Sequence, residues 1–512
     1  MHLQQTFRAP EAAQYLGLGG FYFNGIHLGG ISSNQGIPFF SKQGKEWIHA
    51  HTGSKPAPQP PCPPNAPTQV TGLWELPDRA VVNTYLSIFT TSIRRYVFPI
   101  IDEAAFPDVV EKAYNGHPDQ ADVVCAKACV LAFTCIQVHM EGQLDIQPSL
   151  TVRADQCAAR VYRLMPTILA SSCSESVQVC TMLCMYNMFT GNVAAAATYL
   201  SVAYRFVTML GAHLNPVSMD PTSDTDNPHS SQRYLRRVFW HCYMYDKDIS
   251  LRGGYISIIN DDYCDLTLPP GYKEIDGFDS FKDGTDLIPG DMRLTIIKSN
   301  MIRRLYCAKA FRTPDVDLLK HIRELDDELD QWRISIPPRY RPSLVSSYRM
   351  ELASDWNKAK QAHILVIHFE YYFLLSLIHS ASGRCRIPAS GGVDHRASVN
   401  SCQCLALQAS RTTLANLPVV SQVLSRGDFW YFIQYPLSAS LTIFCNILTS
   451  PLNAQAGEDL ELLQRVPRLI RDMCAVPCVS PGDNMRIRQV EQFVEELLRL
   501  GRSAVQEAAA EG

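Results

Sequence analysis

Apolar residues recur at spacings of three and four from about Leu76 to Leu500, and this is the period of one face of an α-helix. A clear example is the stripe Leu318, Ile322, Leu325, Leu329 and Trp332. Two apolar runs joined only by Gly191 and Asn192 predict a helical hairpin, because a short turn makes the neighbours antiparallel. We therefore expect an all-α fold, a multi-helix array of antiparallel helical hairpins.

The periodicity sets the expected helices. One helix begins at Asp78, and the others cover 121–140, 150–169, 175–189, 193–214, 292–311, 315–334, 355–380, 398–415, 428–448, 458–474 and 483–500. Residues 1–70 differ, because their glycines and the proline-rich run from Lys55 to Pro64 interrupt any long element. We expect an irregular Gly/Pro-rich arm and linker over 1–70 and an all-helical body over 71–512.

Composition excludes several classes of protein. Hydrophobic residues make up 46% and charged residues 19%, which is typical of a globular chain. The formal net charge is −4 and no run of Lys or Arg exceeds a pair, which argues against strong DNA binding by these residues alone. We expect no membrane span, because the best candidate, Ile364–Ile378, is too short and contains His368 and Glu370.

The chain has 17 cysteines but no CxxC pair. Cysteines four residues apart inside apolar runs, such as Cys125 and Cys129, lie on one face of a helix and do not form the turn of a zinc site. We expect buried free thiols, no metal and no cofactor. With no secretory leader recognised at the N-terminus, the expected compartment is reducing and intracellular.

The most informative stretch is Ser231–Pro270. Its first half has a helical apolar stripe, and Gly253 and Gly254 end the helix because glycine adopts the left-handed conformation of a C-cap. β-branched residues follow, then the acidic residues Asp261, Asp262 and Asp265, and then Leu268-Pro269. We expect this second half to be extended and irregular.

These residues resemble the signature of the fungal-specific transcription factor domain, the middle homology region of fungal zinc-cluster regulators. The matching residues are Arg236, Arg237, Phe239, Trp240, Asp246, Asp262, Asp265, Leu268 and Pro269. One departure is Leu251-Arg252-Gly253-Gly254, where the family usually has Gly-Arg-Pro. The resemblance extends over about 20–340, so we expect the signature region at about 76–340 and a helical C-terminal extension over 341–512.

The resemblance implies the regulatory body of a transcriptional regulator that acts in the nucleus. Its partner would be another transcription regulator or the transcription machinery, with DNA reached only indirectly; a homodimer and a small-molecule effector stay open. Family members commonly control metabolic or secondary-metabolite genes. Their two-zinc, six-cysteine module is not found here, so we expect either pairing with another regulator or a first exon missing from the gene model.

The signature residues allow two interpretations. Arg236, Arg237, Trp240 and Asp246 either form a regulatory or partner-binding surface, or they attach their helix to its neighbours through an Arg-to-carboxylate pair and a Trp anchor. We favour the second, because the planar fork of Arg suits a buried pair.

Two alternative functions come from other classes: a helical small-molecule sensor or scaffold, and a Mg²⁺-dependent isoprenoid enzyme. The enzyme would use two DDxxD motifs, at Asp261–Asp265 and Asp326–Asp330, whose carboxylates could bind Mg²⁺ and a diphosphate. The first motif lies in an extended context and the second on the polar face of a helix, so we expect no enzyme and no catalytic residues.

Overall fold

The computed structural model describes residues 20–23, 26–32, 35–58, 72, 75–92, 95, 98–117, 120–141, 152–215, 230–268, 291–345, 349–353, 356, 358–385, 393–475 and 481–511. Helices dominate these residues and the only sheet among them is small, so the all-α prediction is confirmed. Three hydrophobic cores organise the helices.

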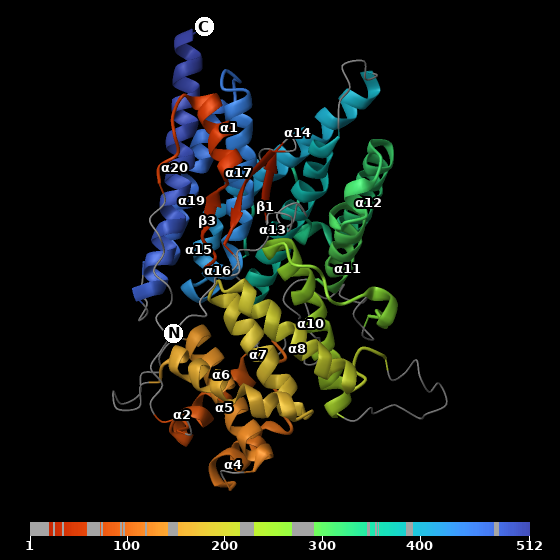
Figure 1. Ribbon diagram of the computed structural model, residues 1–512, viewed down its shortest axis with the longest axis vertical. Helices are drawn as coiled ribbons and strands as arrows, with labels where there is room; N and C mark the ends of the chain where they lie inside the picture. The colour runs from red at the N-terminus through yellow and green to blue at the C-terminus, as the bar shows by residue number, and fades with distance from the viewer. Residues whose placement is uncertain are drawn as a thin grey trace, which may run out of the picture.

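The first core lies in the N-terminal half, in the lower part of Figure 1. Its helices are α2 (Arg79–Thr91), α4 (Phe106–Asn115), α5 (Ala121–Glu141), α6 (Ala154–Ala170), α7 (Ser174–Phe189) and α8 (Val193–Met209). The predicted hairpin of α7 and α8 is present: Gly191 takes a φ of 74°, and the Asn192 side chain accepts a hydrogen bond from the backbone N–H of Ala195. Helix α8 ends earlier than predicted, at Met209, because Gly211 is left-handed.

The second half begins at α10 (Ser230–Gly253), in the middle of the molecule. A 3₁₀ turn (Asp261–Tyr263) follows it, then α11 (Met292–Met301), a π-helical turn (Ile302–Tyr306) and α12 (Asp315–Ser335). The π turn replaces the end of the helix predicted over 292–311. Helix α12 packs on α11 and α13 and contributes to the third core.

The remaining helices are α13 (Lys358–Ser380), α14 (Val393–Ala415), α15 (Val420–Val423), α16 (Phe429–Phe432), α17 (Gln434–Thr449), α18 (Ala456–Leu463), α19 (Arg465–Met473) and α20 (Pro481–Glu511). Two predicted helices are broken in two. Pro436 and Pro467 lie in the first turns of α17 and α19, where a missing N–H costs nothing, and their rings prevent continuation from the preceding helix.

The N-terminal arm is more regular than predicted. Strands β1 (Gly20–Phe23), β2 (Ile26–Ile31) and β3 (Pro38–Phe40) form an antiparallel sheet in the order β1-β2-β3, and α1 (Lys42–Thr52) follows. A Cβ on Gly44 would collide with the carbonyl of Leu28, so this glycine allows α1 to lie directly on β2. Glycine, which the sequence analysis expects to interrupt regular structure in this arm, therefore permits close packing of the α1 and β2 backbones.

The arm shares the second core with the end of the chain. Leu28, Phe40 and Ile48 pack with α17 and α20, and the red arm lies against the blue helices in Figure 1. Elements more than 400 positions apart in the sequence thus pack against each other. Between them, Ala57 N–H donates to Glu496 Oε1 at 2.8 Å. The predicted boundaries of the arm, signature region and extension stay predictions.

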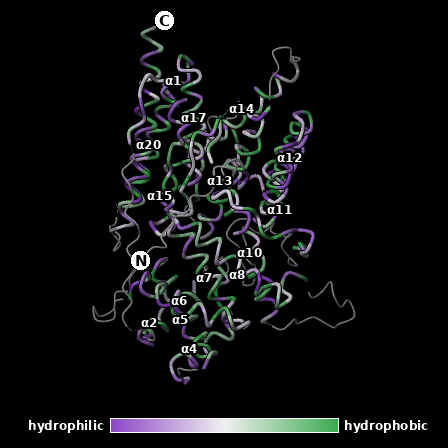
Figure 2. The backbone as a smooth tube through the Cα atoms, in the orientation of Figure 1, coloured by the Kyte–Doolittle hydropathy of each residue, from purple (hydrophilic) through white to green (hydrophobic). Residues whose placement is uncertain are grey.

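Helices α5 and α13 are strongly apolar, as Figure 2 displays. By length and composition alone, two helices of the described chain could cross a membrane: Ala121–Glu141 and Lys360–Arg384. The bent pair Arg426–Phe432 and Gln434–Thr449 passes the same test. The candidate around Ile364–Ile378 is thus longer than expected, but 83% and 78% of the two helical windows are buried inside the protein. Contact with neighbouring helices accounts for their hydrophobicity.

Candidate functional site

Helix α10 places the signature residues Phe239, Trp240 and Asp246 in the protein interior. Phe239 and Trp240 are fully buried in the first core, at 0% and 1% exposure. The Trp240 ring meets Tyr243 edge to face, with 5.6 Å between centroids. The guanidinium of Arg236 lies over the Phe239 and Trp240 rings, 4.6 and 5.4 Å from their centroids. These positions belong to the packing of the helix.

Arg236 joins two segments through backbone carbonyls. Its Nη1 donates to the carbonyls of Ala212 at 3.3 Å and His213 at 3.2 Å, just beyond α8. Its Nη2 donates to the carbonyls of Asp265 and, at 3.4 Å, Thr267. Burial lowers the pKa of Arg236, and the charge of Asp265 opposes this shift. The side chain therefore ties the end of α8 to the acidic segment.

Arg237 makes a similar contact, donating from Nη2 to the carbonyl of Arg95 at 3.1 Å. These hydrogen bonds of Arg236 and Arg237 end on backbone carbonyls, where the sequence predicted a carboxylate. Carbonyl acceptors serve equally well because the guanidinium fork carries five donors, and the turn after α8 offers carbonyls that no helix uses. For Arg236, backbone contacts therefore take the place of the expected Arg-to-carboxylate hydrogen bonds.

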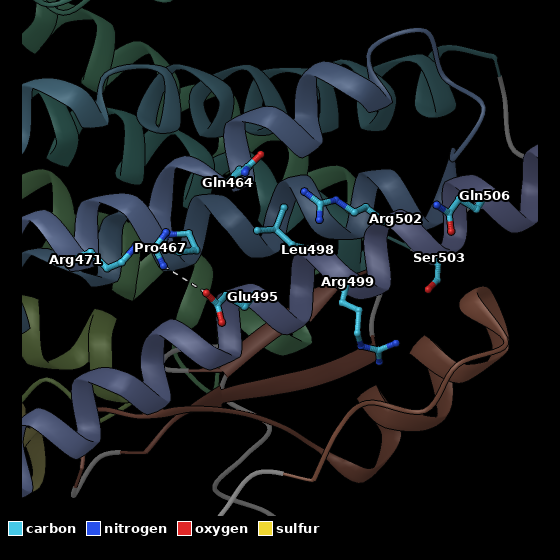
Figure 3. A pocket seen from close by; sticks show the side chains of 9 residues that line it. All are labelled: Gln464, Pro467, Arg471, Glu495, Leu498, Arg499, Arg502, Ser503 and Gln506. Atoms are coloured by element: carbon cyan, nitrogen blue, oxygen red, sulfur yellow. Dashed lines mark hydrogen bonds and ion pairs between the residues drawn. The ribbon is translucent and has the colours of Figure 1, made fainter.

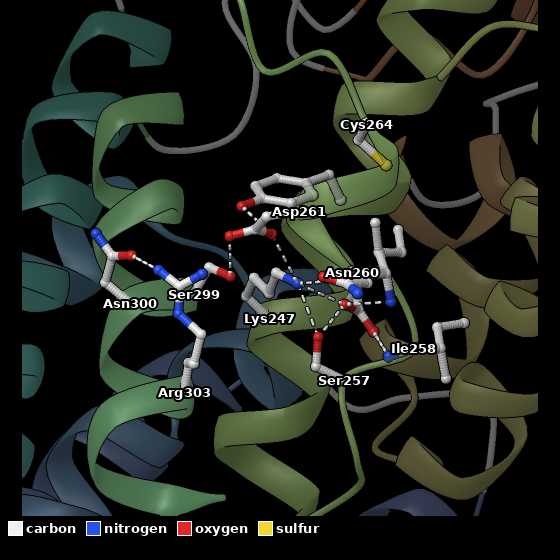
Figure 4. Close-up of polar contacts among 12 residues, drawn as sticks. Lys247, Ser257, Ile258, Asn260, Asp261, Cys264, Ser299, Asn300 and Arg303 are labelled. Carbon is white, nitrogen blue, oxygen red and sulfur yellow. Dashed lines mark hydrogen bonds and ion pairs between the residues drawn. The ribbon is translucent and has the colours of Figure 1, made fainter. Parts of the chain in front are cut away.

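Asp246 holds the extended segment that follows α10, whose Ser257 and Ile258 are labelled in Figure 4. Its Oδ1 accepts from Ile258 N–H at 2.8 Å, and its Oδ2 accepts from Ile259 N–H at 3.2 Å and from Ser257 Oγ at 2.6 Å. The neighbouring Lys247 Nζ donates to Asp246 Oδ2 at 3.0 Å and to the Ile259 carbonyl at 2.7 Å. Asp246 and Lys247 are 2% and 1% exposed, so this pair is a buried polar anchor.

The first acidic motif continues the same network. Asp261 Oδ1 accepts from Tyr243 OH at 3.0 Å and its Oδ2 from Ser299 Oγ at 2.8 Å, while Lys247 Nζ lies 3.8 Å from Oδ1 (Figure 4). Asp262 is exposed, and Asp265 Oδ1 accepts from the N–H of Thr267 at 2.8 Å, closing its own turn. Pro269 lies outside the described residues.

A second buried network was missed in the sequence. Lys298 Nζ of α11 lies between Asp248 of α10, at 2.6 Å, and Glu370 of α13, with which it also forms an ion pair. Arg252 Nη2 lies 3.8 Å from Asp248 Oδ2, and the Tyr431 hydroxyl donates to that oxygen at 3.0 Å. The positive charges of Lys298 and Arg252 therefore balance the negative charges of Asp248 and Glu370. All four side chains have less than 10% of their surface exposed.

Electrostatics supports the charged state of most of this network. Burial alone would raise the pKa of Asp248, but Lys298 and Arg252 outweigh it and hold that pKa below its usual value. Burial raises the pKa of Glu370 against the opposing charge of Lys298. The carboxylates raise the pKa of Lys298, although burial opposes them. Lone charges inside apolar helix stretches, Lys298 in α11 and Glu370 in α13, were the available sequence signal, because such charges need buried partners.

We define the interhelix joint as Asp248, Arg252, Lys298 and Glu370. Arg252 extends it to the C-terminal helices by donating from Nη1 to the Tyr431 carbonyl at 2.7 Å, and its guanidinium lies 4.2 Å from the Tyr431 ring centroid. Helix α10 itself has residues in the first core, and its Leu251 belongs to the third. The joint therefore lies where the cores meet.

The second acidic motif lies on α12, away from this network. Asp326 Oδ1 is 3.3 Å from the buried His379 Nε2, Asp330 pairs with Arg333 at 2.7 Å, and Asp327 is exposed. Within the described ranges, no group of three or more His, Cys, Asp or Glu side chains is arranged to hold a metal ion. Asp261 of the first motif and Asp326 of the second are thus engaged in separate networks.

Two pockets open near the C-terminal helix. One, of about 480 Å³, lies between α19 and α20 and is lined by Arg471, Glu495, Arg499 and Arg502 among others (Figure 3). The other, of about 490 Å³, lies between β3 and α20, against Phe39, Phe493 and Gln489. The first is polar and the second mixed, so they differ in the ligands they could accept.

Comparisons with known proteins agree with the resemblance. Residues 94–334 match the family described as the Fungal specific transcription factor domain. An ABC-transporter-regulating transcription factor of Aspergillus fumigatus is 26% identical over 530 residues, covering 94% of this chain and 55% of that protein. Its counterpart of the same name in Aspergillus oryzae is 25% identical, with the same coverage.

A more distant relative is the activatory protein CHA4 of Saccharomyces cerevisiae, which is 21% identical over 289 residues and matches 53% of this chain and 42% of its own. The chain spans about half the length of the curated Aspergillus relatives it matches. No solved structure matches. Residues 94–334, the part of the chain that matches the Fungal specific transcription factor domain, include α10 and most of its anchoring contacts.

Proposed function

We propose that this chain is the regulatory body of a fungal transcriptional regulator. The observation that carries the proposal is the match of residues 94–334 to the fungal specific transcription factor domain, together with relatives that are named transcription factors. Nuclear action and control of a metabolic, transporter or secondary-metabolite gene set follow from the same similarity and belong to the proposal. A catalytic role has no support from either acidic motif.

DNA contact would come from a zinc module or a partner and not from these 512 residues. The sequence has no CxxC pair, no run of Lys or Arg longer than a pair and a net charge of −4, which argues against a two-zinc module and against strong DNA binding by these residues alone. A partner regulator, or a zinc module joined to this chain in a longer protein, would supply base recognition. The chain would then act on the transcription machinery by its attachment to that module.

Helix α10 is the proposed element through which the cores influence one another. The signature residues Arg236, Arg237, Phe239, Trp240, Asp246 and Asp265 would attach the helix and its following segment, and the interhelix joint would connect it to α11, α13 and α16. A regulatory domain requires an element whose change of position alters the packing of distant parts of the domain at the same time. The buried, charge-balanced joint supports α10 in this role, because its pairs must move or break as a unit.

The test joins residues 1–512 to a heterologous DNA-binding domain and measures a reporter gene in a fungal host. The fusion should change reporter output relative to the DNA-binding domain alone. A fusion that is expressed and nuclear but leaves the reporter unchanged across several nutrient conditions would contradict the regulatory proposal.

The joint is tested in the same assay with the double variant Lys298→Met, Glu370→Gln. This variant removes one cation and one carboxylate charge and retains the Asp248–Arg252 pair, so charge stays balanced. The matched control, Arg79→Met with Glu111→Gln, makes the same change in an exposed pair. Altered output only for the joint variant, with the purified protein still folded, supports α10 as the coupling element. Equal output for both variants would contradict it.

A second candidate function, small-molecule sensing, is favoured by the pocket between α19 and α20. Arg471 and Arg499 are paired with Glu491 and Glu496, whereas Arg502 has no ion-pair partner within the described part of the chain. An anionic metabolite of moderate size would suit these arginines. Thermal-shift measurements with small carboxylates and phosphates test it: Arg502→Gln should remove a stabilisation that Arg488→Gln retains. No stabilisation by any anion would reject it.

A further inference from the structure

A pocket distinct from the arginine-lined one opens where the N-terminal arm lies against α20 (Figure 1). It has a volume of about 490 Å³ and is bounded by β3, by the segment at Ala57 and Pro58, and by α20 between Gln489 and Glu496. Concave sites that hold small molecules have volumes of this size. The pocket exists only because the two ends of the chain pack together.

One part of the pocket lining is aromatic and aliphatic. The Phe40 and Phe493 rings, 7% and 3% exposed, lie with 4.8 Å between their centroids. The half-buried Phe39, together with Ile37 and Pro38, extends this apolar surface. A planar ring would gain more here than an aliphatic group of the same size, because aromatic pairs stack or meet edge to face in addition to burying area.

The other part of the lining is polar but uncharged. Gln489 is only 8% exposed, and Ser32, Gln35 and Gln492 also line the pocket. Each glutamine carboxamide carries two N–H donors and one carbonyl acceptor. Among the described lining residues there is no Lys or Arg, so an anionic ligand would find no cation in the lining.

Glu496 is the one charged side chain among the lining residues that the structure describes, and its charge is already balanced. Arg499 donates from Nη2 to Oε1 at 2.7 Å and from Nε to Oε2 at 2.8 Å, and Ala57 N–H donates to Oε1. Burial alone would raise the pKa of Glu496, but Arg499 and Ala57 outweigh it and hold that pKa below its usual value. A cationic ligand would therefore gain little from this carboxylate, and the lining suits an uncharged molecule.

The walls of the pocket are held in place by contacts that need no ligand. Arg486 of α20 donates from Nη1 to the carbonyl of Gln35 at 3.4 Å and to the carbonyl of Thr190 at 2.9 Å, in the turn between α7 and α8. The same guanidinium lies 4.8 Å from the centroid of the Trp430 ring. Ala57 is held by Glu496, as described above. A pocket with fixed walls loses little conformational entropy when it binds a ligand.

We propose that the pocket between β3 and α20 binds a small, uncharged, planar molecule, an aromatic ring that carries an amide or a similar hydrogen-bonding group. The ring lies against Phe39 and Phe493, and the polar group bonds to the carboxamides of Gln489 and Gln492. This site differs in place and in chemistry from the pocket between α19 and α20, which suits anions.

The experiment measures binding of acetanilide, a benzene ring with an uncharged amide, to the purified full chain by saturation-transfer NMR. Two analogues separate the contributions: N-cyclohexylacetamide lacks the aromatic ring, and para-acetamidobenzoate adds a negative charge. Acetanilide should bind in the millimolar range, as expected of a ligand with few atoms. N-cyclohexylacetamide should bind about threefold to tenfold more weakly, and para-acetamidobenzoate should not displace acetanilide.

Variants assign the binding to this pocket. Gln492 is exposed at the pocket rim, so Gln492→Trp should leave the fold intact, fill the opening and abolish the acetanilide signal. The matched control is Gln506→Trp, an exposed glutamine of the same helix that lines the other pocket, and it should bind acetanilide as the wild type does. Gln489→Leu keeps the size of the side chain and should weaken binding about fivefold through the lost hydrogen bond. Thermal melting checks that each variant is folded.

The proposal is overturned if the wild type gives no saturation transfer to acetanilide, or if folded Gln492→Trp binds it as tightly as the wild type. It is also overturned if para-acetamidobenzoate displaces acetanilide and binds more tightly. These readouts need only the purified chain and are independent of any effect on transcription, so failure here and failure of the regulatory proposal can be told apart.

Discussion

The two acidic motifs have the same DDxxD pattern but different surroundings in the fold. Asp261 of the first motif is held by Tyr243, Ser299 and Lys247 in a largely buried network. In the second motif, on α12, Asp327 is exposed, Asp330 pairs with a partly exposed arginine, and Asp326 alone reaches a buried partner, His379. The comparison teaches that the surrounding elements, and not the pattern, decide what a carboxylate does.

The largest effect is expected where the first motif is anchored. Asp246→Ala removes the acceptor for Ile258 and Ile259 and leaves Lys247 buried beside only the more distant Asp261. Breaking a buried pair on one side should lower the free energy of unfolding by about 3–5 kcal/mol. Chemical denaturation measures this, with exposed Asp262→Ala as the control. If Asp246→Ala and Asp262→Ala lower the free energy of unfolding equally, Asp246 does not anchor the segment.

A smaller loss is expected within the motif itself. Asp261→Asn keeps the shape but replaces one of the acceptor oxygens used by Tyr243 and Ser299 with an amide that donates. The free energy of unfolding should fall by about 1–3 kcal/mol, the usual result of leaving a buried polar group unsatisfied. The equivalent change Asp330→Asn in the second motif should cost less, because its pair with Arg333 is partly exposed. Equal losses would remove the distinction between the motifs.

The contact between Asp326 of the second motif and His379 should make the stability of the protein depend on pH. Burial opposes protonation of His379, but Asp326 and Cys402 outweigh it and raise the pKa of His379 to about 9. Because this folded-state pKa lies above the unfolded value, the stabilisation is fully present below about pH 6.5 and is lost as pH rises through about 9. Denaturation midpoints of wild type and Asp326→Asn should differ at pH 6 and converge above pH 9. A difference between the two midpoints that stays constant with pH would show that the Asp326–His379 pair is not its source.

The smallest effect is expected at Asp327. Its side chain is exposed on α12, and Asp327→Asn should change the free energy of unfolding by no more than about 0.5 kcal/mol, as for most surface substitutions. The same variant tests the enzyme alternative. Mg²⁺-dependent release of diphosphate from a prenyl diphosphate by wild type, abolished by Asp327→Asn, would contradict the structural interpretation of both motifs.

Much of this arrangement could be predicted from local sequence. The buried stripe of α12 and the hairpin at Gly191 and Asn192 depend on periodicity and turn chemistry, which act over a few residues. Burial of Trp240 also agrees with the apolar character of its helix. Breaks at Pro436 and Pro467 were missed because a long apolar period continues across them, although proline in a first turn is a recognisable start signal.

The long-range contacts could not be predicted in the same way. Arg236 was expected to find a carboxylate and instead meets carbonyls beyond α8, because only the packed neighbours determine which acceptors lie within reach. The arm was expected to be irregular, yet its glycines permit a small sheet and α1 to pack on α17 and α20. Such β pairing depends on a surface supplied from the far end of the chain.

The sequence by itself determined that this protein is helical and that α10 and its acidic segment follow the pattern of a fungal transcription factor domain. Periodicity, caps and motif order are local properties, and the amino acids carry them wherever the helices lie. Only the tertiary structure decided that Asp248, Arg252, Lys298 and Glu370 meet in one balanced network. That network depends on how α10, α11 and α13 pack, and burial then increases the strength of its ion pairs, because the low-dielectric interior strengthens electrostatic interactions.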